Sequence, residues 1–180
     1  MIEVESKVNI SERELREIRQ EIGKLGKFEK KEKKIDDYYT LENLKSYPKK
    51  SLRIRKQGKG YTVNFKQSIS YEKGIHAKKE TEFHVDDVGG FLALIKDFGF
   101  KMWLRKEKES EVYHVHENLH IEINNVKGLG WFLEIEYLAK DKKEIKKAER
   151  EIENLRKLLG INNKQIVKDG YTKQLWEKRR

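Results

Sequence analysis

The sequence predicts an α+β protein whose antiparallel strands close into a barrel, with helices packed outside it. Apolar and polar residues alternate with a period of two along most of the chain, which is the pattern of half-buried strands. Only four stretches show helical spacing instead. The polar strand faces carry mostly charged residues, so closing the sheet would gather them in one polar interior and leave the apolar faces for the helices.

The composition fits a single domain over residues 1–180 and favours an anionic partner. Charged residues make up 40% of the chain, and its net charge is +10. This surplus favours a phosphate, a nucleotide, a nucleic acid or a membrane surface, although a Lys- and Glu-rich chain is also typical of thermophilic proteins. The lack of cysteine excludes disulfides and thiolate metal sites. Without a secretion signal or an apolar run of membrane-spanning length, we expect a cytoplasmic protein and no membrane partner.

In the first half of the chain, one helix interrupts a series of strands. Ser11 and Glu14 form a capping-box pattern that begins a helix reaching about Leu25. The lysine-rich run 27–34 predicts an exposed turn and strand edge. Glycines at 58 and 60 predict a hairpin. Strands are expected at 2–9, 35–42, 51–57, 61–68 and 76–85.

The second half alternates strands with three helical stretches. Asp86 begins a helix that stops at Gly99, and Asp141 begins a long helix that ends at Gly160. A last helical stretch carries Tyr171 and Trp176, and the C-terminal helices, about 141–180, should pack on the barrel. Strands are expected at 101–108, 111–116, 119–125 and 131–138.

Two short motifs at opposite ends of the predicted sheet each place two carboxylates on one strand face. Side chains alternate between the faces of a strand, so Glu3 and Glu5 share a face, with Lys7 beside them. Glu134 and Glu136 share a face of the last predicted strand in the same way. Neighbouring carboxylates repel one another unless a cation lies between them, and a hard metal ion is the usual solution.

The strands between these motifs carry basic side chains instead. Arg53 and Arg55 share one strand face, and Lys66 lies on the polar face of the next strand. Arginines clamp phosphate oxygens bidentately, and lysines act as point charges. Phosphoryl transfer needs mainly positioning and charge neutralisation, so an interior with acids for a metal ion and bases for phosphate would supply both.

The ordered set of motifs resembles the CYTH superfamily, also called triphosphate tunnel metalloenzymes, over nearly the whole chain. The resemblance implies an eight-stranded antiparallel tunnel with helices outside. The run from Gly128 to Glu136, Gly-Leu-Gly-x-Phe-x-Glu-Ile-Glu, is most similar to the class IV adenylate cyclase branch. The other matching positions are Glu3-x-Glu5-x-Lys7, Tyr38–Tyr39, Arg53-x-Arg55, Lys66, Glu80-x-Glu82, Arg105, and Tyr171 ahead of Leu175.

The resemblance also implies roles for individual residues and the cofactor Mg²⁺ or Mn²⁺. Lys7 and Arg105 are expected to be catalytic. One departure concerns Asn124, which stands where the family usually has an aspartate, and Glu122 on the same face is expected to compensate. The predicted triphosphate ligands are Lys7, Arg53, Arg55, Lys66 and Arg105, and the predicted metal ligands are Glu3, Glu5, Glu122, Asn124, Glu134 and Glu136.

Three functions remain open from the sequence. The first is a class IV cyclase-like conversion of ATP to cyclic AMP and pyrophosphate. The second is hydrolysis of thiamine triphosphate, inorganic triphosphate or a nucleotide. The third is a non-catalytic module that binds polyphosphate or nucleic acid; the grouped carboxylates argue against it, because they repel a phosphate backbone, and we expect no specific nucleic-acid partner. The resemblance alone suggests a homodimer.

Overall fold

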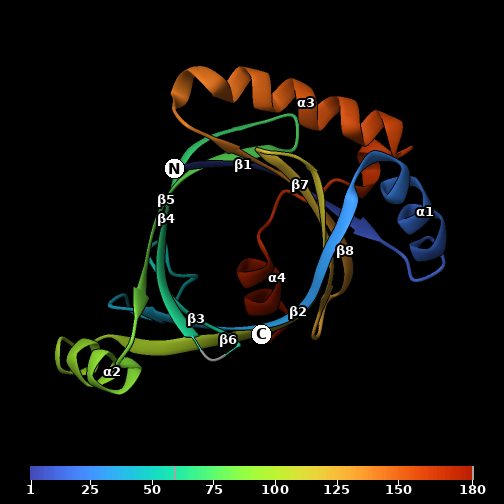
Figure 1. The fold of residues 1–180 in the computed structure, drawn as a ribbon. Coiled ribbons are helices and arrows are strands. Elements are labelled where there is room, and N and C mark those ends of the chain that lie inside the picture. Colours follow the sequence, from blue (N-terminus) through green and yellow to red (C-terminus); the bar gives the residue numbers. More distant parts are fainter. Residues whose placement is uncertain (59, 180) are drawn as a thin grey trace.

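Eight antiparallel strands close into a barrel in the computed structural model of the chain, which describes residues 1–58 and 60–179 (Figure 1). Around the barrel the strands follow the order β1-β5-β4-β3-β2-β6-β7-β8. The predicted fold is thereby confirmed. The strands are β1 (Ile2–Ile10), β2 (Lys27–Thr40), β3 (Leu52–Gln57), β4 (Gly60–Glu72), β5 (Ile75–Val85), β6 (Lys101–His116), β7 (Leu119–Val126) and β8 (Gly130–Ala139).

Three helices cover the apolar outer faces of this barrel, and a fourth lies at an opening of the tunnel. The first three are α1 (Leu15–Leu25), α2 (Val88–Asp97) and α3 (Ile145–Leu158), and the fourth is α4 (Tyr171–Lys178). Figure 1 shows α3 lying across the strands β1 and β8, and α2 at the opposite side of the barrel. Among the described residues, no helix is long and apolar enough to cross a membrane.

The core lies between the outer strand faces and the helices, as the alternation of residues requires. Ile135 is fully buried in a cluster with Ile152 of α3, and Val4 of β1 belongs to the same cluster. A second, smaller cluster places Ile54 and Val63 beneath Ile95 of α2. Apolar side chains therefore point outward, and the charged side chains of the same strands point into the tunnel.

Several element boundaries differ from the predicted ones. Residues 101–116 form one strand, not two, because β6 pairs with β2 from Lys101 to His114. The lysine run 27–34 is part of strand β2 and not a turn. Glu14, not Ser11, occupies the helix-cap position, and its carboxylate accepts hydrogen bonds from the Ser11 amide and hydroxyl.

Two further caps also differ from the expected ones. Asp87 rather than Asp86 caps α2, accepting a hydrogen bond from the Gly90 amide. Asp141 caps a short 3₁₀ turn, Lys142–Glu144, ahead of α3. The predicted hairpin is confirmed by the pairing of β3 with β4, while Lys59 itself lies outside the described residues.

The C-terminal segment reaches the tunnel after α3 has crossed its outside. The amide of Val167 donates a hydrogen bond to the carbonyl of Lys7, and the next turn brings Tyr171 into the barrel. The Tyr171 ring packs on Phe132 with the ring centres 4.8 Å apart. It also lies 4.6 Å from the Lys7 ammonium. Figure 1 accordingly shows α4 across the opening when the barrel is viewed along its axis.

Candidate active site in a charged tunnel

A cavity of about 710 Å³ runs through the barrel, and all eight strands contribute side chains to it. This volume is within the range of small-molecule sites in proteins. Eleven Lys and Arg side chains and eight Asp and Glu side chains line it, so the wall has a surplus of positive charge. The predicted site residues that line it are Glu3, Glu5, Lys7, Arg53, Arg55, Lys66, Glu122, Glu134 and Glu136.

One side of the cavity is a carboxylate wall, which we define as Glu3 and Glu5 of β1 with Glu134 and Glu136 of β8. The two strands are paired so that Glu5 lies directly opposite Glu136, and Lys7 lies opposite Glu134. Like charges at directly opposed positions of an antiparallel pair are destabilising. Lysines offset part of this repulsion, since the Nζ atoms of Lys66 and Lys7 lie 2.5 Å from Glu3 and 2.7 Å from Glu134.

Two members of this wall, Glu134 and Glu136, have pKa values shifted in opposite directions from the usual value of a glutamate. Burial, together with the nearby charge of Glu3, raises the pKa of Glu136 to about 7. The pKa of Glu134 falls to about 2, because the charges of Lys7 and Lys108 outweigh the effect of its burial. The closest basic group to Glu136 is the imidazole of His120, whose Nε2 lies 3.6 Å from its carboxylate. Glu136 therefore lacks the cationic partners that Glu134 has.

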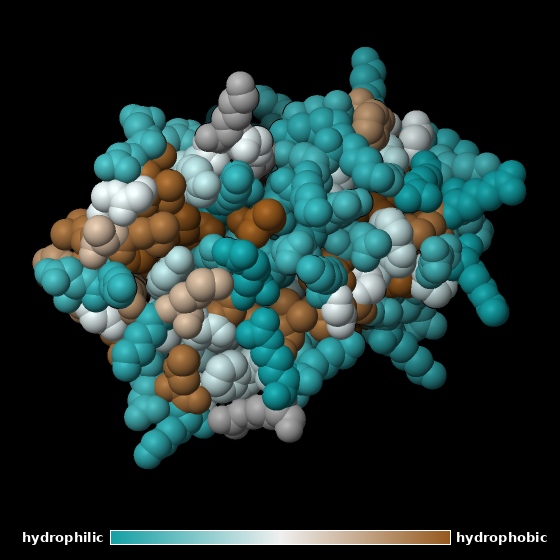
Figure 2. Space-filling model, turned by 90° about the horizontal axis from the view of Figure 1, so that it is seen from below, coloured by the Kyte–Doolittle hydropathy of each residue, from teal (hydrophilic) through white to brown (hydrophobic). Residues whose placement is uncertain are grey.

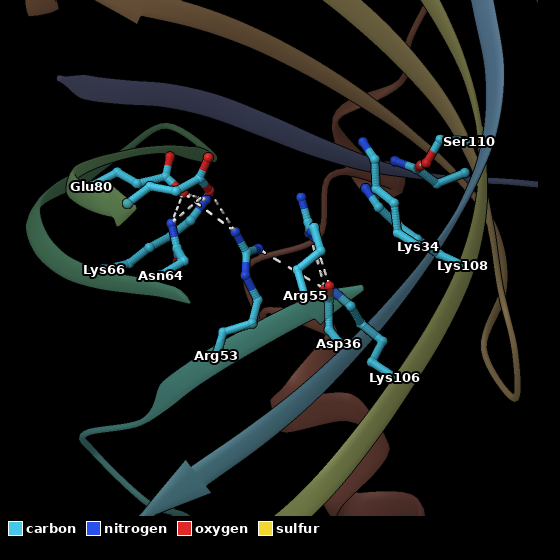
Figure 3. A network of polar contacts seen from close by, with 12 residues as sticks. Lys34, Asp36, Arg53, Arg55, Asn64, Lys66, Glu80, Lys106, Lys108 and Ser110 are labelled. Atoms are coloured by element: carbon cyan, nitrogen blue, oxygen red, sulfur yellow. Dashed lines mark hydrogen bonds and ion pairs between the residues drawn. The ribbon is translucent and has the colours of Figure 1, made fainter. Parts of the chain in front are cut away.

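The other side of the cavity carries a cation cluster, which we define as Arg53, Arg55 and Lys106 around the carboxylate of Asp36. Arg55 donates two hydrogen bonds to Asp36 at 2.7 and 3.0 Å, and the Lys106 ammonium lies 2.9 Å away. Figure 3 shows these side chains converging from β2, β3 and β6. Three cations thus surround one carboxylate, and the cluster has a net positive charge.

Burial and electrostatics explain why this carboxylate stays ionised. Asp36 is fully buried, and burial alone would raise its pKa. The charges of Lys106 and Arg55 outweigh that effect and hold the pKa of Asp36 well below its usual range. Asp36 therefore fixes the basic side chains in place and cannot neutralise all of them, so cationic groups remain available to an anion in the cavity.

A third group links the two sides of the tunnel. The Glu122 carboxylate lies 2.9 Å from the Lys34 ammonium and 2.7 Å from that of Lys108. Lys108 also lies 3.3 Å from Glu134 in the carboxylate wall. These charges hold the pKa of Glu122 well below its usual range despite its burial. Glu122 is consequently occupied by two lysines rather than free to compensate for Asn124.

The donor chemistry of the carboxylate wall fits a divalent metal ion, although within residues 1–58 and 60–179 no three His, Asp or Glu side chains converge as a ready ligand set. Mg²⁺ and Mn²⁺ prefer carboxylate oxygens. Glu5 and Glu136 oppose each other, and Glu136 is the one whose pKa is raised by its surroundings. A cation bound between them would relieve this repulsion. The side chains whose chemistry suits such an ion are those of Glu3, Glu5, Glu134 and Glu136.

Two predicted site residues lie elsewhere. Arg105 lies on the outer face of β6, where its Nε donates to Asp37 at 2.7 Å and its side chain is 54% exposed. The predicted contact of Arg105 with a triphosphate in the tunnel does not fit this position. Asn124 is buried behind the cavity lining, where its amide donates to Glu134 at 2.7 Å and its carbonyl accepts from Ser110.

Lys106 and Lys108 face the tunnel where Arg105 was expected. The sequence carried a signal for them, since lysine and glutamate alternate from Lys106 to Glu109 and must point to opposite faces. A β-bulge at Trp103, where Tyr38 pairs with Leu104 and Tyr39 with Met102, obscured the phase of this strand. Other residues that line the cavity and that the sequence did not identify include Lys34, Lys78 and His120. Asp36, also missed, is buried against Arg55 and Lys106.

The chain is similar to a known protein family over most of its length. The model of the CYTH domain matches residues 1–171. This chain belongs to the CYTH family. The match covers all eight strands of the barrel and ends at Tyr171, the residue that packs against Lys7 inside it.

Individual proteins are similar to this chain in sequence or in fold. The chain is 31% identical over 121 residues to a Methanocaldococcus jannaschii protein named "Putative adenylate cyclase MJ0240", covering 67% of this chain and 68% of that one. The PH1819 protein of Pyrococcus horikoshii has a similar fold, with a TM-score of 0.80, 29% identity, and coverage of 98% of this chain and 99% of that one.

A more distant structure shares the fold alone. It is the Hippeastrum protein HpAC1, which is 16% identical to this chain with a TM-score of 0.68. The alignment covers 99% of this chain and 96% of that one. The barrel of this chain is therefore shared along its whole length with a plant protein of very different sequence.

Proposed function

We propose that this CYTH protein is a divalent-metal-dependent enzyme that binds an organic triphosphate in its tunnel and converts ATP to cyclic AMP and pyrophosphate. The observation that carries the proposal is the pair of unlike walls, with a cation cluster facing a carboxylate wall across one cavity. A triphosphate needs the first, and the metal ion that accompanies it needs the second.

Different residues of the chain would bind the phosphates and the metal ion. Arg53, Arg55 and Lys106 would hold the phosphate oxygens, with Asp36 fixing their positions. Lys7, between Glu5 at 3.6 Å and Glu134 at 2.7 Å, would join the phosphate to the carboxylate wall. A bound Mg²⁺ or Mn²⁺ would neutralise charge that develops on the phosphate oxygens. Glu3, Glu5, Glu134 and Glu136 would hold it.

An aromatic rim next to the cation cluster supports an organic rather than an inorganic substrate. We define the rim as Tyr38, Tyr47 and Trp103, which all line the cavity. The rings of Tyr47 and Trp103 meet edge to face at 5.6 Å, and the Tyr38 ring lies 5.7 Å from the Lys106 ammonium. Aromatic side chains stack on the flat faces of heterocyclic rings such as nucleobases, whatever the identity of the base. A base or thiazole ring attached to the phosphates would find its contact here.

Two reactions are compatible with this arrangement, and they differ in which phosphorus is attacked. In cyclisation, the 3′-oxygen of the ribose bonds to the α-phosphorus while the bond to pyrophosphate breaks. In hydrolysis, a water oxygen bonds to the γ-phosphorus while the bond to the diphosphate breaks. The name of the Methanocaldococcus relative supports the first reaction.

Hydrolysis is the second candidate, and one comparison favours it. The structure of HpAC1 is described in the words "Putative adenylyl cyclase HpAC1 from Hippeastrum reveals a dominant triphophatase activity". The same cation cluster would serve hydrolysis if the phosphates lay further along the tunnel. Thiamine triphosphate, a nucleotide or inorganic triphosphate would then be the substrate.

The decisive experiment is product analysis with three substrates. The protein would be incubated with ATP, thiamine triphosphate or inorganic triphosphate, each with Mg²⁺, with Mn²⁺ or with a chelator. Cyclic AMP and pyrophosphate from ATP are expected, and only with metal. ADP and phosphate instead would establish the second candidate. Turnover in excess chelator would contradict the assignment of the carboxylate wall.

The same preparation tests the third function. If the net charge of +10 were the basis of function, generic DNA or RNA would bind tightly, and binding would weaken steeply with salt. We expect only weak binding, because the carboxylate wall repels a polyanion that brings no metal. Tight binding that survives physiological salt would favour a nucleic-acid module. A cytoplasmic location stays a prediction.

A further inference from the structure

Tyr171, the first residue of α4, lies inside the tunnel, in contrast to the aromatic side chains around α2. Phe83 and Phe98 beside α2 are 50% and 70% exposed, and Figure 2 shows apolar side chains gathered at the surface where α2 lies. Tyr171 is only 5% exposed and lines the cavity. The C-terminal segment therefore inserts one aromatic ring among the charged side chains of the barrel interior.

The position of this ring is fixed by contacts with β8 and with β1. The Phe132 ring packs on the Tyr171 ring at an angle of 69°, with the ring centres 4.8 Å apart. Shortly before Tyr171, the amide of Val167 donates a hydrogen bond of 2.8 Å to the carbonyl of Lys7. The backbone contact therefore ties the ring to the strand position from which the Lys7 side chain enters the tunnel.

The Tyr171 ring contacts one ammonium group from each side of the tunnel. Its centre lies 4.6 Å from the Lys7 ammonium and 5.4 Å from the Lys106 ammonium. Lys7 also lies 2.7 Å from Glu134 of the carboxylate wall. Lys106 belongs to the cation cluster, where it lies 2.9 Å from Asp36. An ammonium group within about 6 Å of the centre of an aromatic ring is attracted by the negative face of the ring, and more strongly where water is excluded.

A carboxylate orients an ammonium group but offsets its charge, whereas an aromatic face orients it without adding a charge. The Tyr171 side chain stays neutral, because burial and the nearby charge of Glu134 raise its pKa well above the ordinary value of a tyrosine. It restricts the positions of Lys7 and Lys106 and leaves the positive surplus of the cavity unchanged. Lysines that are ordered before an anion arrives lose less conformational entropy when it binds.

These contacts come from the aromatic ring and not from the hydroxyl group. Within residues 1–58 and 60–179, the hydroxyl of Tyr171 is buried and has no hydrogen-bond partner. A phenylalanine at this position would keep both ammonium contacts. An aliphatic side chain would keep the apolar character and lose both contacts.

We propose that Tyr171 is a positioning residue whose aromatic face holds the ammonium groups of Lys7 and Lys106 in place for the phosphates of the substrate. The inference rests on the proposed function, in which these two lysines bind the triphosphate. It makes the C-terminal segment a part of the binding site and not only a cover at the opening of the barrel.

The first test is the affinity of variants at position 171 for inorganic triphosphate, measured by calorimetry in excess chelator. Tyr171→Leu should raise the dissociation constant about tenfold, since both lysines must then be ordered on binding. Tyr171→Phe should bring it back to within about twofold of the wild type, because the ring is retained. The affinity of Tyr171→Leu for Mn²⁺ without triphosphate should change less than about twofold, because the carboxylate wall is intact.

A series of fluorinated phenylalanines at position 171 separates the aromatic face from simple packing. Each added fluorine weakens the negative face of the ring and barely alters its shape. Triphosphate affinity should therefore fall stepwise from phenylalanine to the mono-, di- and trifluorinated residues, while the thermal midpoint stays nearly constant. Equal affinity across the series would overturn the proposal, even if Tyr171→Leu failed to fold.

The matched control is Tyr137→Leu, because Tyr137 is fully buried in the core between the barrel and the helices. Its thermal midpoint should fall while its triphosphate affinity stays unchanged. A wild type that turns over ATP with metal, while all variants at position 171 bind triphosphate equally well, would overturn this inference alone. A wild type that neither turns over nor binds a triphosphate would overturn the proposed function and this inference with it.

Discussion

Asp36 is fully buried against the cavity lining and Glu136 is a partly buried member of that lining, yet their surroundings shift their pKa values in opposite directions. Asp36 lies among Arg53, Arg55 and Lys106, and its pKa is far below the usual range. Glu136 has Glu3 and Glu5 as neighbours, and its ion-pair contact among the described residues is with His120, so burial and the charge of Glu3 raise its pKa to about 7. Burial acts on both in the same direction, so the difference comes from the neighbouring charges.

This difference indicates what each wall is suited to bind. Where cations outnumber carboxylates, a buried acid is locked in its ionised form and the surplus cations attract an anion. On the carboxylate wall the pKa values of Glu3, Glu5 and Glu134 are lowered by nearby lysines, and that of Glu136 alone is raised, so a metal ion bound there would replace the proton of Glu136. This contrast supports the proposed function, in which the two sides of one cavity would bind the two parts of a metal–triphosphate complex.

The largest expected effect comes from removing the acid of the cation cluster. Asp36→Asn should lower the free energy of unfolding by about 3–5 kcal/mol, because it leaves Arg55 and Lys106 buried without their counter-charge. Urea denaturation would measure it. Asp37→Asn is the matched control, since the side chain of Asp37 points outward to the half-exposed Arg105, and a loss of at most about 1 kcal/mol is expected. Equal losses would contradict the comparison of the two faces.

The enzymatic activity of the protein should depend on Lys106, which faces the tunnel, and not on the neighbouring Arg105. Lys106→Ala should reduce kcat/KM for the triphosphate by about 10²–10³-fold, the usual cost of one positioned charge that stabilises the transition state. Arg105→Ala, one residue away on the outer face, should change it less than about threefold, because that side chain is paired with Asp37 outside the tunnel. Steady-state kinetics of both variants decides which face of β6 is functional. A larger effect of Arg105→Ala would restore its predicted role.

The pair Lys106 and Arg105 also shows how far sequence reasoning reached. The alternation of charged and apolar residues was sufficient to orient β1, β3 and β8 correctly, because their strands run without interruption in register. In β6, the tunnel position of Arg105 was implied by the resemblance and not by alternation. The bulge at Trp103 shifts the phase of this strand by one residue just before Arg105, and such a shift moves side chains to the other face. Such bulges depend on pairing with a distant strand, which local patterns do not report.

The role of Asp36 could not be predicted from the sequence for a different reason. The sequence places two aspartates and two tyrosines in succession, from Asp36 to Tyr39, and nothing local distinguishes the aspartate inside the tunnel from the one outside. Its role arises only when Arg55 and Lys106 arrive from other strands. The carboxylate wall could be predicted, by contrast, because Glu3 with Glu5 and Glu134 with Glu136 each form their pair within one strand.

The pH dependence of stability should separate Glu136 from Glu134. The pKa of Glu136 is raised in the folded state from 4.5 to about 7, so folding favours its protonated form, and this contribution is lost as pH rises through that interval. Glu136→Gln should therefore stabilise the protein by about 1–3 kcal/mol at roughly pH 8 and have little effect below pH 4.5. Added Mg²⁺ or Mn²⁺ should stabilise the wild type more than this variant.

Glu134→Gln should act with the opposite sign. The pKa of Glu134 is lowered to about 2, so its ionised form stabilises the fold above 4.5, and the contribution is lost only as pH falls towards 2. The substitution should lower the thermal midpoint at about pH 8, since Lys7 loses its closest partner. If both variants shifted the midpoint in the same direction at this pH, the contrast between the two carboxylates would be wrong.

The smallest effect is expected at Asn124, where the sequence predicted a metal ligand. Asn124 lies behind Glu134 and does not line the cavity, because its amide donates to Glu134 and its carbonyl accepts from Ser110. Asn124→Asp would supply the carboxylate that the family usually carries. If position 124 contacted the metal directly, the added charge should tighten Mn²⁺ binding by tenfold or more. From its position we expect the dissociation constant for Mn²⁺, measured by calorimetry, to change less than about threefold, since a charge behind a ligand acts only indirectly.

The same substitution, Asn124→Asp, should lower the thermal midpoint of the metal-free protein, because it removes the amide donor and the new carboxylate repels Glu134. Ser110→Ala, which removes the other hydrogen bond of Asn124 without adding charge, is the control that separates this repulsion from the loss of a hydrogen bond.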